Sequence, residues 1–345
     1  MNIASIVRRL TGVILGTWLT YSQITPTTAS EHRECVGRYE LTLPDDFEVA
    51  TTRLKIREKY VEHTTEFPDG EIAPLSSFIA NGDFQITRGL SKSDYERIMS
   101  DVRAGLREYD DYVRLSNVRT GRMDTVAFLG SRSGEFYLYK GDFFVSFHTA
   151  DFSTATGEDA AKNVNAQLMS TLSGLKFREI GSVPREAGDC LPYLFIRKER
   201  IDARKIGVTF RLERHPDVTI FILDDASRAK ANLTSRQKNE FAWKYSGLGV
   251  QVELDHEPVP FHTVDLDGRN GVSSFGTITR NDGTTDYGYL ATVQGDPNAP
   301  LDTPDLMLLV QRTAKYAKGN PPISPEELKR MAKDIAASVK RRPVQ

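Results

Sequence analysis

Residues 135–147, EFYLYKGDFFVSF, interleave aromatic side chains with polar and charged ones around the tripeptide Lys140-Gly141-Asp142. A short glycine-containing turn between two β-prone runs predicts a hairpin of antiparallel strands. An exposed aromatic binding surface is one interpretation of this stretch. Aromatic strands more often bury one face, so we expect one aromatic face of the hairpin to lie in the core.

The neighbouring segments extend the hairpin into a unit of strands and helices. Residues 112–118 and 123–129 precede it and show the alternation of strands. Further upstream, Ser91 and Asp94 form a helix cap that opens a run of apolar residues at helical spacing. After the hairpin, residues 158–172 show the same helical spacing. Strands are also predicted at 40–43 and within 47–60, so the first half has the predicted order strands, helix, antiparallel strands, helix.

The second half repeats this order. Strands are predicted at 206–212 and 218–223, a helix at about 235–244, and further strands between 250 and 311. A closing helix opens with the capping box Ser324-Pro325-Glu326-Glu327. The predicted fold class is α+β, with two related domains, each a mostly antiparallel sheet with helices packed on one face.

Chain length agrees with two domains, because 345 residues exceed the usual size of one. The stretch 181–188, which contains Pro184, has the composition of a linker. We expect an N-terminal domain over residues 31–180 and a C-terminal domain over residues 189–342.

The N-terminus has the features of a secretory signal peptide. Arg8 and Arg9 supply positive charge, residues 11–24 are uncharged and mostly apolar or small, and small residues surround Ala29. We expect cleavage after residues 1–29 and no stable membrane insertion afterwards, since the apolar run is short for a spanning helix. An uncleaved membrane anchor is the alternative. Export into an oxidising compartment of a bacterium follows from this interpretation.

Composition and charge exclude several classes of partner. A 39% hydrophobic and 27% charged chain is ordinary for a globular protein. The net charge is −2, and removal of residues 1–29, which hold two arginines and no acid, lowers it to −4. No basic stripe of the kind that binds nucleic acid is present, so no nucleic-acid partner is expected.

Cys35 and Cys190 are the two cysteines of the chain. In an oxidising compartment an even pair indicates a possible disulfide; two buried thiols are the alternative. Two cysteines and six scattered histidines lack the spacing of a zinc site, so we expect neither a metal nor another cofactor.

Catalytic motifs do not emerge from the sequence, and we expect no catalytic residues. The string Gly130-Ser131-Arg132-Ser133-Gly134 resembles a nucleophile elbow, but arginine occupies the place of the serine. Glycine-rich phosphate loops after a strand are also missing. Adjacent acids such as Asp224-Asp225 are interpreted as the polar end of a strand.

Two loops are candidates for partner contact, because loops on a rigid scaffold commonly carry recognition. One covers residues 64–77 and the other residues 282–287. Within and beside the second, Asp282, Tyr287 and Tyr289 are the predicted partner-binding residues, with the two tyrosines as amphipathic anchors.

The residues Cys35-Val36-Gly37-Arg38-Tyr39, running into Leu43-Pro44, resemble the start of the N-terminal domain in the type VI secretion lipase-immunity family. The second half is similar to the C-terminal immunity domain of that family. It opens with Asp189-Cys190, and residues 207–212 and 215–220 resemble its paired strands. Residues 266–271 resemble a glycine-containing turn of that domain. This sequence departs from the family pattern at two places, because Val272-Ser273 replace the acids that usually follow the turn and no glycine follows Cys190.

This resemblance implies a periplasmic, non-catalytic immunity protein that binds and inhibits a secreted lipase or phospholipase effector. The two domains would grip the toxin and block substrate access, protecting the producing cell. Two alternatives remain from the residues themselves: an exported hydrolase with an unrecognised site, and a periplasmic ligand- or lipid-binding module.

Overall fold

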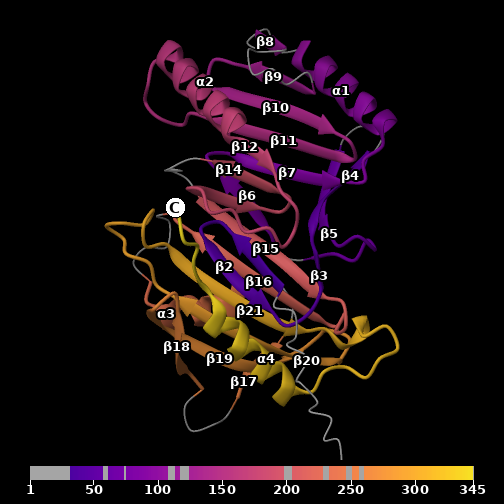
Figure 1. Ribbon diagram of the computed structural model, residues 1–345, viewed down its shortest axis with the longest axis vertical. Helices are drawn as coiled ribbons and strands as arrows, with labels where there is room; N and C mark the ends of the chain where they lie inside the picture. The colour runs from indigo at the N-terminus through magenta and orange to yellow at the C-terminus, as the bar shows by residue number, and fades with distance from the viewer. Residues whose placement is uncertain are drawn as a thin grey trace, which may run out of the picture.

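The computed structural model describes most of the chain that follows the predicted signal peptide (Figure 1). The described residues are 32–56, 61–73, 75–107, 113–116, 124–197, 204–227, 233–245, 251–255 and 260–344. The predicted signal peptide, residues 1–29, lies outside these ranges.

A fourteen-stranded sheet runs through both halves of the described chain (Figure 1). Its neighbours pair antiparallel, as between β15 and β16 or β19 and β20. The main path has the order β17 (Gln251–Leu254), β19 (Arg269–Thr279), β20 (Thr285–Val293), β21 (Asp305–Arg312), β16 (Val218–Asp225), β15 (Arg204–Leu212), β6 (Ser77–Ala80), β7 (Asp83–Arg88), β11 (Phe143–Ala150), β10 (Ser133–Lys140), β9 (Thr125–Leu129) and β8 (Val113–Ser116). Beside this path, β18 (His262–Leu266) pairs with β19 and β3 (Phe47–Val49) pairs with β15.

Helices cover both faces of the sheet. On one face lie α2 (Gly157–Gly174) and α4 (Pro325–Ser338), in front of the sheet in Figure 1. On the other lie α1 (Lys92–Arg107) and α3 (Ser235–Tyr245). Alternation along β20 fixes the two faces, because Tyr289 packs with the α4 core and Leu290 packs with α3.

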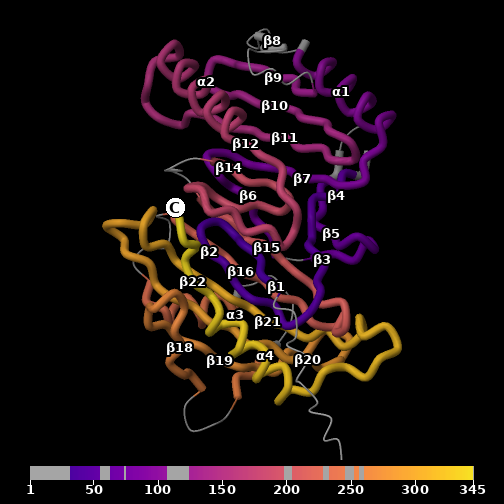
Figure 2. The backbone as a smooth tube through the Cα atoms, viewed as in Figure 1, coloured from indigo at the N-terminus to yellow at the C-terminus, as the bar shows by residue number. Residues whose placement is uncertain are grey.

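Three small sheets complete the fold. The first joins β1 (His32–Val36), β2 (Tyr39–Leu43) and β22 (Lys340–Arg341), and Figure 2 shows these strands side by side near the labelled C-terminus. The second joins β12 (Leu175–Phe177), β14 (Leu194–Arg197) and β13 (Gly188–Leu191), and the third is the hairpin of β4 (Thr51–Ile56) and β5 (Val61–Glu66). A 3-10 turn, η2 (Ala314–Tyr316), follows β21.

The predicted α+β class with a mostly antiparallel sheet is confirmed, with one difference. The helices were expected on one face, whereas they lie on both. The hairpin at 135–147 shows the reason: Phe136 joins the core beneath α2, while Tyr137 packs with α1 on the opposite face. The sheet is therefore an internal layer, and amphipathic alternation does not reveal which side is covered. The division into two domains at 181–188 stays a prediction.

A disulfide joins Cys35 of β1 to Cys190 of β13, 155 residues apart in sequence. Both cysteines are buried against Phe195. Directly beside them, the N–H groups of Gly37 and Cys190 each donate to the carbonyl oxygen of the other at 2.8 Å. The disulfide therefore attaches the first strands of the chain to the beginning of its second half.

We predict that the double variant Cys35→Ala/Cys190→Ala loses about 5 kcal/mol of unfolding free energy. The disulfide closes a long loop and so reduces the conformational entropy of the unfolded chain, and this restriction is lost in the variant. Urea denaturation monitored by circular dichroism measures the change. Reduction of the wild-type protein should lower its midpoint to that of the double variant. An unchanged midpoint after reduction would contradict the prediction.

Candidate functional site

The two halves of the chain meet where β15 pairs with β6, a contact that we call the seam. Four residue pairs join the strands, from Arg204 opposite Ala80 to Gly207 opposite Ser77. Strand β3, also from the first half, continues along the rest of β15. Main-chain hydrogen bonds thus hold the halves in one orientation.

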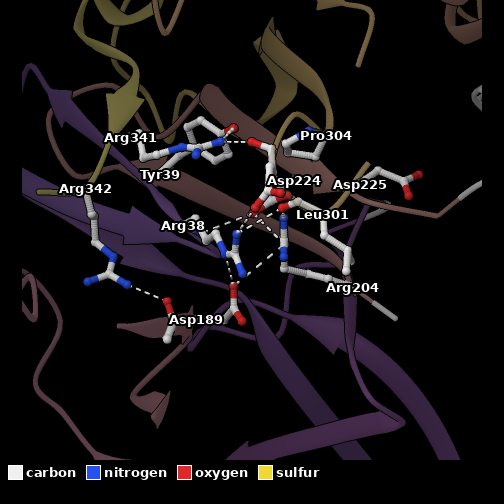
Figure 3. Close-up of polar contacts among 12 residues, drawn as sticks. Arg38, Tyr39, Asp189, Arg204, Asp224, Asp225, Leu301, Pro304, Arg341 and Arg342 are labelled. Atoms are coloured by element: carbon white, nitrogen blue, oxygen red, sulfur yellow. Dashed lines mark hydrogen bonds and ion pairs between the residues drawn. The ribbon is translucent and has the colours of Figure 1, made fainter. Parts of the chain in front are cut away.

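Charged side chains are buried at the end of the seam (Figure 3). Nε of Arg204 lies 2.9 Å from Oδ2 of Asp224 and 3.6 Å from Oδ1 of Asp189. Arg204 and Arg38 both donate to the carbonyl oxygen of Leu301, at 3.1 and 2.9 Å. The cluster therefore links β15, β16, the β1–β2 turn and the loop before β21.

The turn between β1 and β2 fits against this cluster closely. The backbone N–H of Arg38 donates to Oδ2 of Asp224 at 3.0 Å. Gly37 has a φ of +54°, and a Cβ atom there would lie 2.3 Å from the same carboxylate oxygen. Only glycine fits this approach without a shift of Asp224.

Burial shapes the electrostatics of the cluster. It raises the pKa of the Asp189 carboxyl to about 6, with Asp224 as a further cause and Arg204 opposing the shift. Burial also lowers the pKa of the Arg38 guanidinium. Because Asp189 and Arg204 are 0% and 1% exposed, the cluster is closed to large ligands and acts as a structural link.

The predicted partner-binding residues occupy different environments. Asp282 is exposed, and its Oδ1 accepts hydrogen bonds from the backbone and hydroxyl of Thr284 within the turn. Tyr287 is half-buried, stacked on Phe275 at 6.1 Å between ring centroids. Tyr289 is 3% exposed and belongs to the core. Its burial removes Tyr289 from the surface that a partner could touch; a role for Asp282 stays a prediction.

The segment that follows β21 contacts both of the predicted contact loops. Lys318, just after η2, forms an ion pair with Asp69 of the first loop at 2.6 Å. On its other side, the backbone N–H of Ala314 donates to Asp286 beside the second loop at 2.7 Å. The segment 314–318 therefore connects the two loops.

Arg211 of β15 fixes the first loop from below. Its guanidinium contacts Asp69 at 2.8 Å and Glu48 at 2.5 Å, and it also pairs with Glu71. The Phe67 ring lies 4.4 Å from the same guanidinium. Sequence analysis missed Arg211, because its partners lie about 140 to 160 residues away and each looks like a solvated charge.

A pocket of about 260 Å³ under α1 contains the side chains that come nearest to a catalytic set. Ser146, His148 and Glu135 all line it. The Ser146 hydroxyl, however, donates to Gln85 at 3.0 Å and Glu135 accepts from Tyr137 at 2.9 Å. The serine is therefore not hydrogen-bonded to a base that could activate it.

Two further features concern the described ranges, namely metal-binding clusters and membrane-spanning helices. There, no three or more His, Cys, Asp or Glu side chains come together in a way that could hold a metal ion. None of the described helices has the length and apolar character needed to cross a membrane.

The described chain is thus an α+β fold in which one large sheet carries helices on both faces, with loops and pockets on either side of the seam. No protein-family model matches the chain, and no curated protein does. Solved structures do match it. The immunity protein TplEi of the type VI secretion system from Pseudomonas aeruginosa, complexed with "L" peptide, is 14% identical with a TM-score of 0.58, covering 92% of this chain and 99% of that one.

Two further structures agree. The apo form of TplEi is 15% identical with a TM-score of 0.57, and the Tle4–Tli4 complex contains a chain that is 15% identical with a TM-score of 0.58. Each match covers 91% of this chain and 98% of the other. The chain therefore has the fold of type VI secretion immunity proteins over nearly its whole described length, and the resemblance inferred from short motifs extends to the fold.

Removal of the central cation of the seam should be costly. We predict that Arg204→Met lowers the unfolding free energy by about 3–5 kcal/mol, because Asp224 and Asp189 would stay buried without their closest cation. Urea denaturation at neutral pH measures the loss. Arg236→Met, which breaks an exposed pair with Glu240 on α3, is the control and should change stability by less than about 1 kcal/mol.

Asp189 should make stability depend on pH. Because its folded-state pKa is raised from 3.8 to about 6, the protonated carboxyl favours the fold. This contribution is complete below about pH 4 and is lost as the pH rises through 6. We predict that Asp189→Asn matches the wild-type protein at pH 4 and is more stable by about 2 kcal/mol at pH 7.5. A variant that is less stable at pH 7.5 would show that Arg204 needs the ionised carboxylate.

Proposed function

We propose that this chain is a periplasmic immunity protein that binds and inhibits a lipase or phospholipase effector of a type VI secretion system. The observation that carries the proposal is the fold match with TplEi, which extends over 99% of that immunity protein. A match of this extent covers both halves of this chain, which supports a common overall fold. The opening motif at Cys35 and the second start at Asp189-Cys190 support the lipase-inhibiting branch.

Export supports the same proposal. The features of residues 1–29 are those of a signal peptide, and the Cys35–Cys190 disulfide suits an oxidising compartment such as the periplasm. An inhibitor of a toxin that attacks lipids protects the cell only in the compartment that the toxin enters. Signal cleavage after Ala29 and a periplasmic location are part of the proposal.

Inhibition would act by binding rather than by chemistry. In this proposal the chain has no enzymatic activity, and its two halves hold the effector so that lipid cannot reach the active site. A stable interface of about 1,600 Å² would suffice, and it needs a rigid frame to keep its binding cost low. The paired strands and buried charges of the seam supply such rigidity.

The test is co-purification and inhibition with the lipase encoded beside this gene. We expect a stable complex on gel filtration and loss of phospholipid hydrolysis as the chain is titrated to equal concentration. An unrelated secreted lipase is the control and should keep its activity. If the neighbouring lipase forms no complex and keeps full activity at molar excess of this chain, the proposal is wrong.

A further inference from the structure

Between α1 and α3, the sheet face that carries these two helices has a central band without a helix over it in the described chain; the β4–β5 hairpin packs against β7 there and forms one wall of the band. Toward one edge, Tyr137 and Phe144 lie beneath α1. Toward the other, Leu290 and Leu309 lie beneath α3. Strands β6 and β7 lie between these two regions, and side chains such as Ile79 are half-exposed.

Three neighbouring hollows lie along this band. One of about 410 Å³ lies beside α3, one of about 330 Å³ lies over β6 and β7, and the third is the 260 Å³ pocket under α1. The first two share Ser76 and Ser77, and the last two share His63, Asp83 and Gln85. We call this row of neighbouring hollows the α1–α3 groove. It crosses the seam and is therefore lined by both halves of the chain.

The α3 end of the groove is apolar. Phe221, Met307 and Leu309 form its floor, and Phe241 of α3, 39% exposed, stands at its wall. The Lys238–Asp305 ion pair, 2.5 Å long, lies among the lining residues. A pocket of this volume and composition accepts large apolar side chains or a small apolar ligand.

The middle is polar, and the α1 end places a few polar side chains beside apolar ones such as Leu54 and Phe144. Ser76, Ser77 and Thr65 present hydroxyl groups, and Gln85 uses its side-chain oxygen to accept from Ser146, which leaves its amide nitrogen to donate. At the α1 end, exposed Asp83 supplies negative charge.

The polarity of the groove favours a polypeptide over an acyl chain as its occupant. An acyl chain could fill the α3 end, but it would desolvate the hydroxyl and amide groups of the middle without pairing them. A polypeptide backbone carries N–H and C=O groups that pair with such side chains. A basic side chain would complement Asp83, and burial raises the pKa of neighbouring Glu135, a shift that a nearby cation would oppose.

We propose that the α1–α3 groove binds an extended segment of a protein partner, with large apolar side chains in the α3 end and a basic side chain beside Asp83. This inference rests on the proposed function and names the place where the effector is held. Its segment would contact both halves at once, so binding would depend on the fixed geometry of the seam. TplEi, the protein of similar fold, has been solved with a peptide, which agrees with a polypeptide occupant.

The test compares variants of the groove with matched variants elsewhere, using the neighbouring lipase as the probe. Phe241→Ala removes an apolar wall, and Asp83→Lys reverses the charge at the other end. We expect each to weaken the dissociation constant at least about tenfold by isothermal titration calorimetry. Phe152→Ala, at a loop residue 93% exposed, and Asn165→Arg, on exposed α2, are the controls and should stay within about twofold.

Thermal unfolding of each variant separates loss of binding from loss of fold. If the wild-type protein binds the lipase and both groove variants bind it with the same affinity, the groove proposal is wrong and the proposed function is unaffected. Failure of the wild-type protein to bind would overturn both. A third outcome concerns lipid. If the wild-type protein binds a fluorescent fatty acid, and Phe241→Ala abolishes this binding without changing the affinity for the lipase, the groove binds an acyl chain and the proposal is also wrong.

Discussion

The buried guanidinium of Arg204 is the constraint on which the rest of this molecule depends. A cation in a protein interior must be paired, and here Asp224 and Asp189 pair it from two different elements. Arg38 adds a second cation that shares the carbonyl oxygen of Leu301. Because these contacts come from separate elements, the first strands, the seam and the loop before β21 occupy one arrangement.

That arrangement has a consequence on the opposite side of the sheet. With β15 and β6 paired in register, the faces that carry α3 and α1 belong to one continuous surface. A rotation of one half against the other would separate Ser77 from the hollow beside α3 and break the α1–α3 groove. The buried charges and the groove thus both depend on the pairing of β15 with β6. The affinity of a partner in the groove would therefore depend on the relative position of the two halves.

Local sequence patterns predicted many of the helices and strands of this fold, whereas contacts between residues far apart in the sequence could not be predicted from them. Helix caps at Ser324 and the turn at Gly141 act within a few residues, so the sequence alone reveals them. Asp224 looks like a polar strand end until Arg204 and the backbone of Arg38, 186 residues away, are found beside it. Tyr289 was predicted as an amphipathic anchor because it follows a turn, but its ring packs in the core, a burial that its position beside the turn does not reveal.

The same physics explains why the candidate site was hard to find in the sequence. Catalytic and metal sites need particular residue types, and their motifs are conspicuous; a binding groove needs only a shape and a graded polarity. Ser77, Gln85 and Phe241 are ordinary residues in unremarkable strings, and they acquire meaning when β6, β7 and α3 bring them to one surface. For the proposed binding function, the informative feature is therefore the sheet face between α1 and α3 rather than any motif.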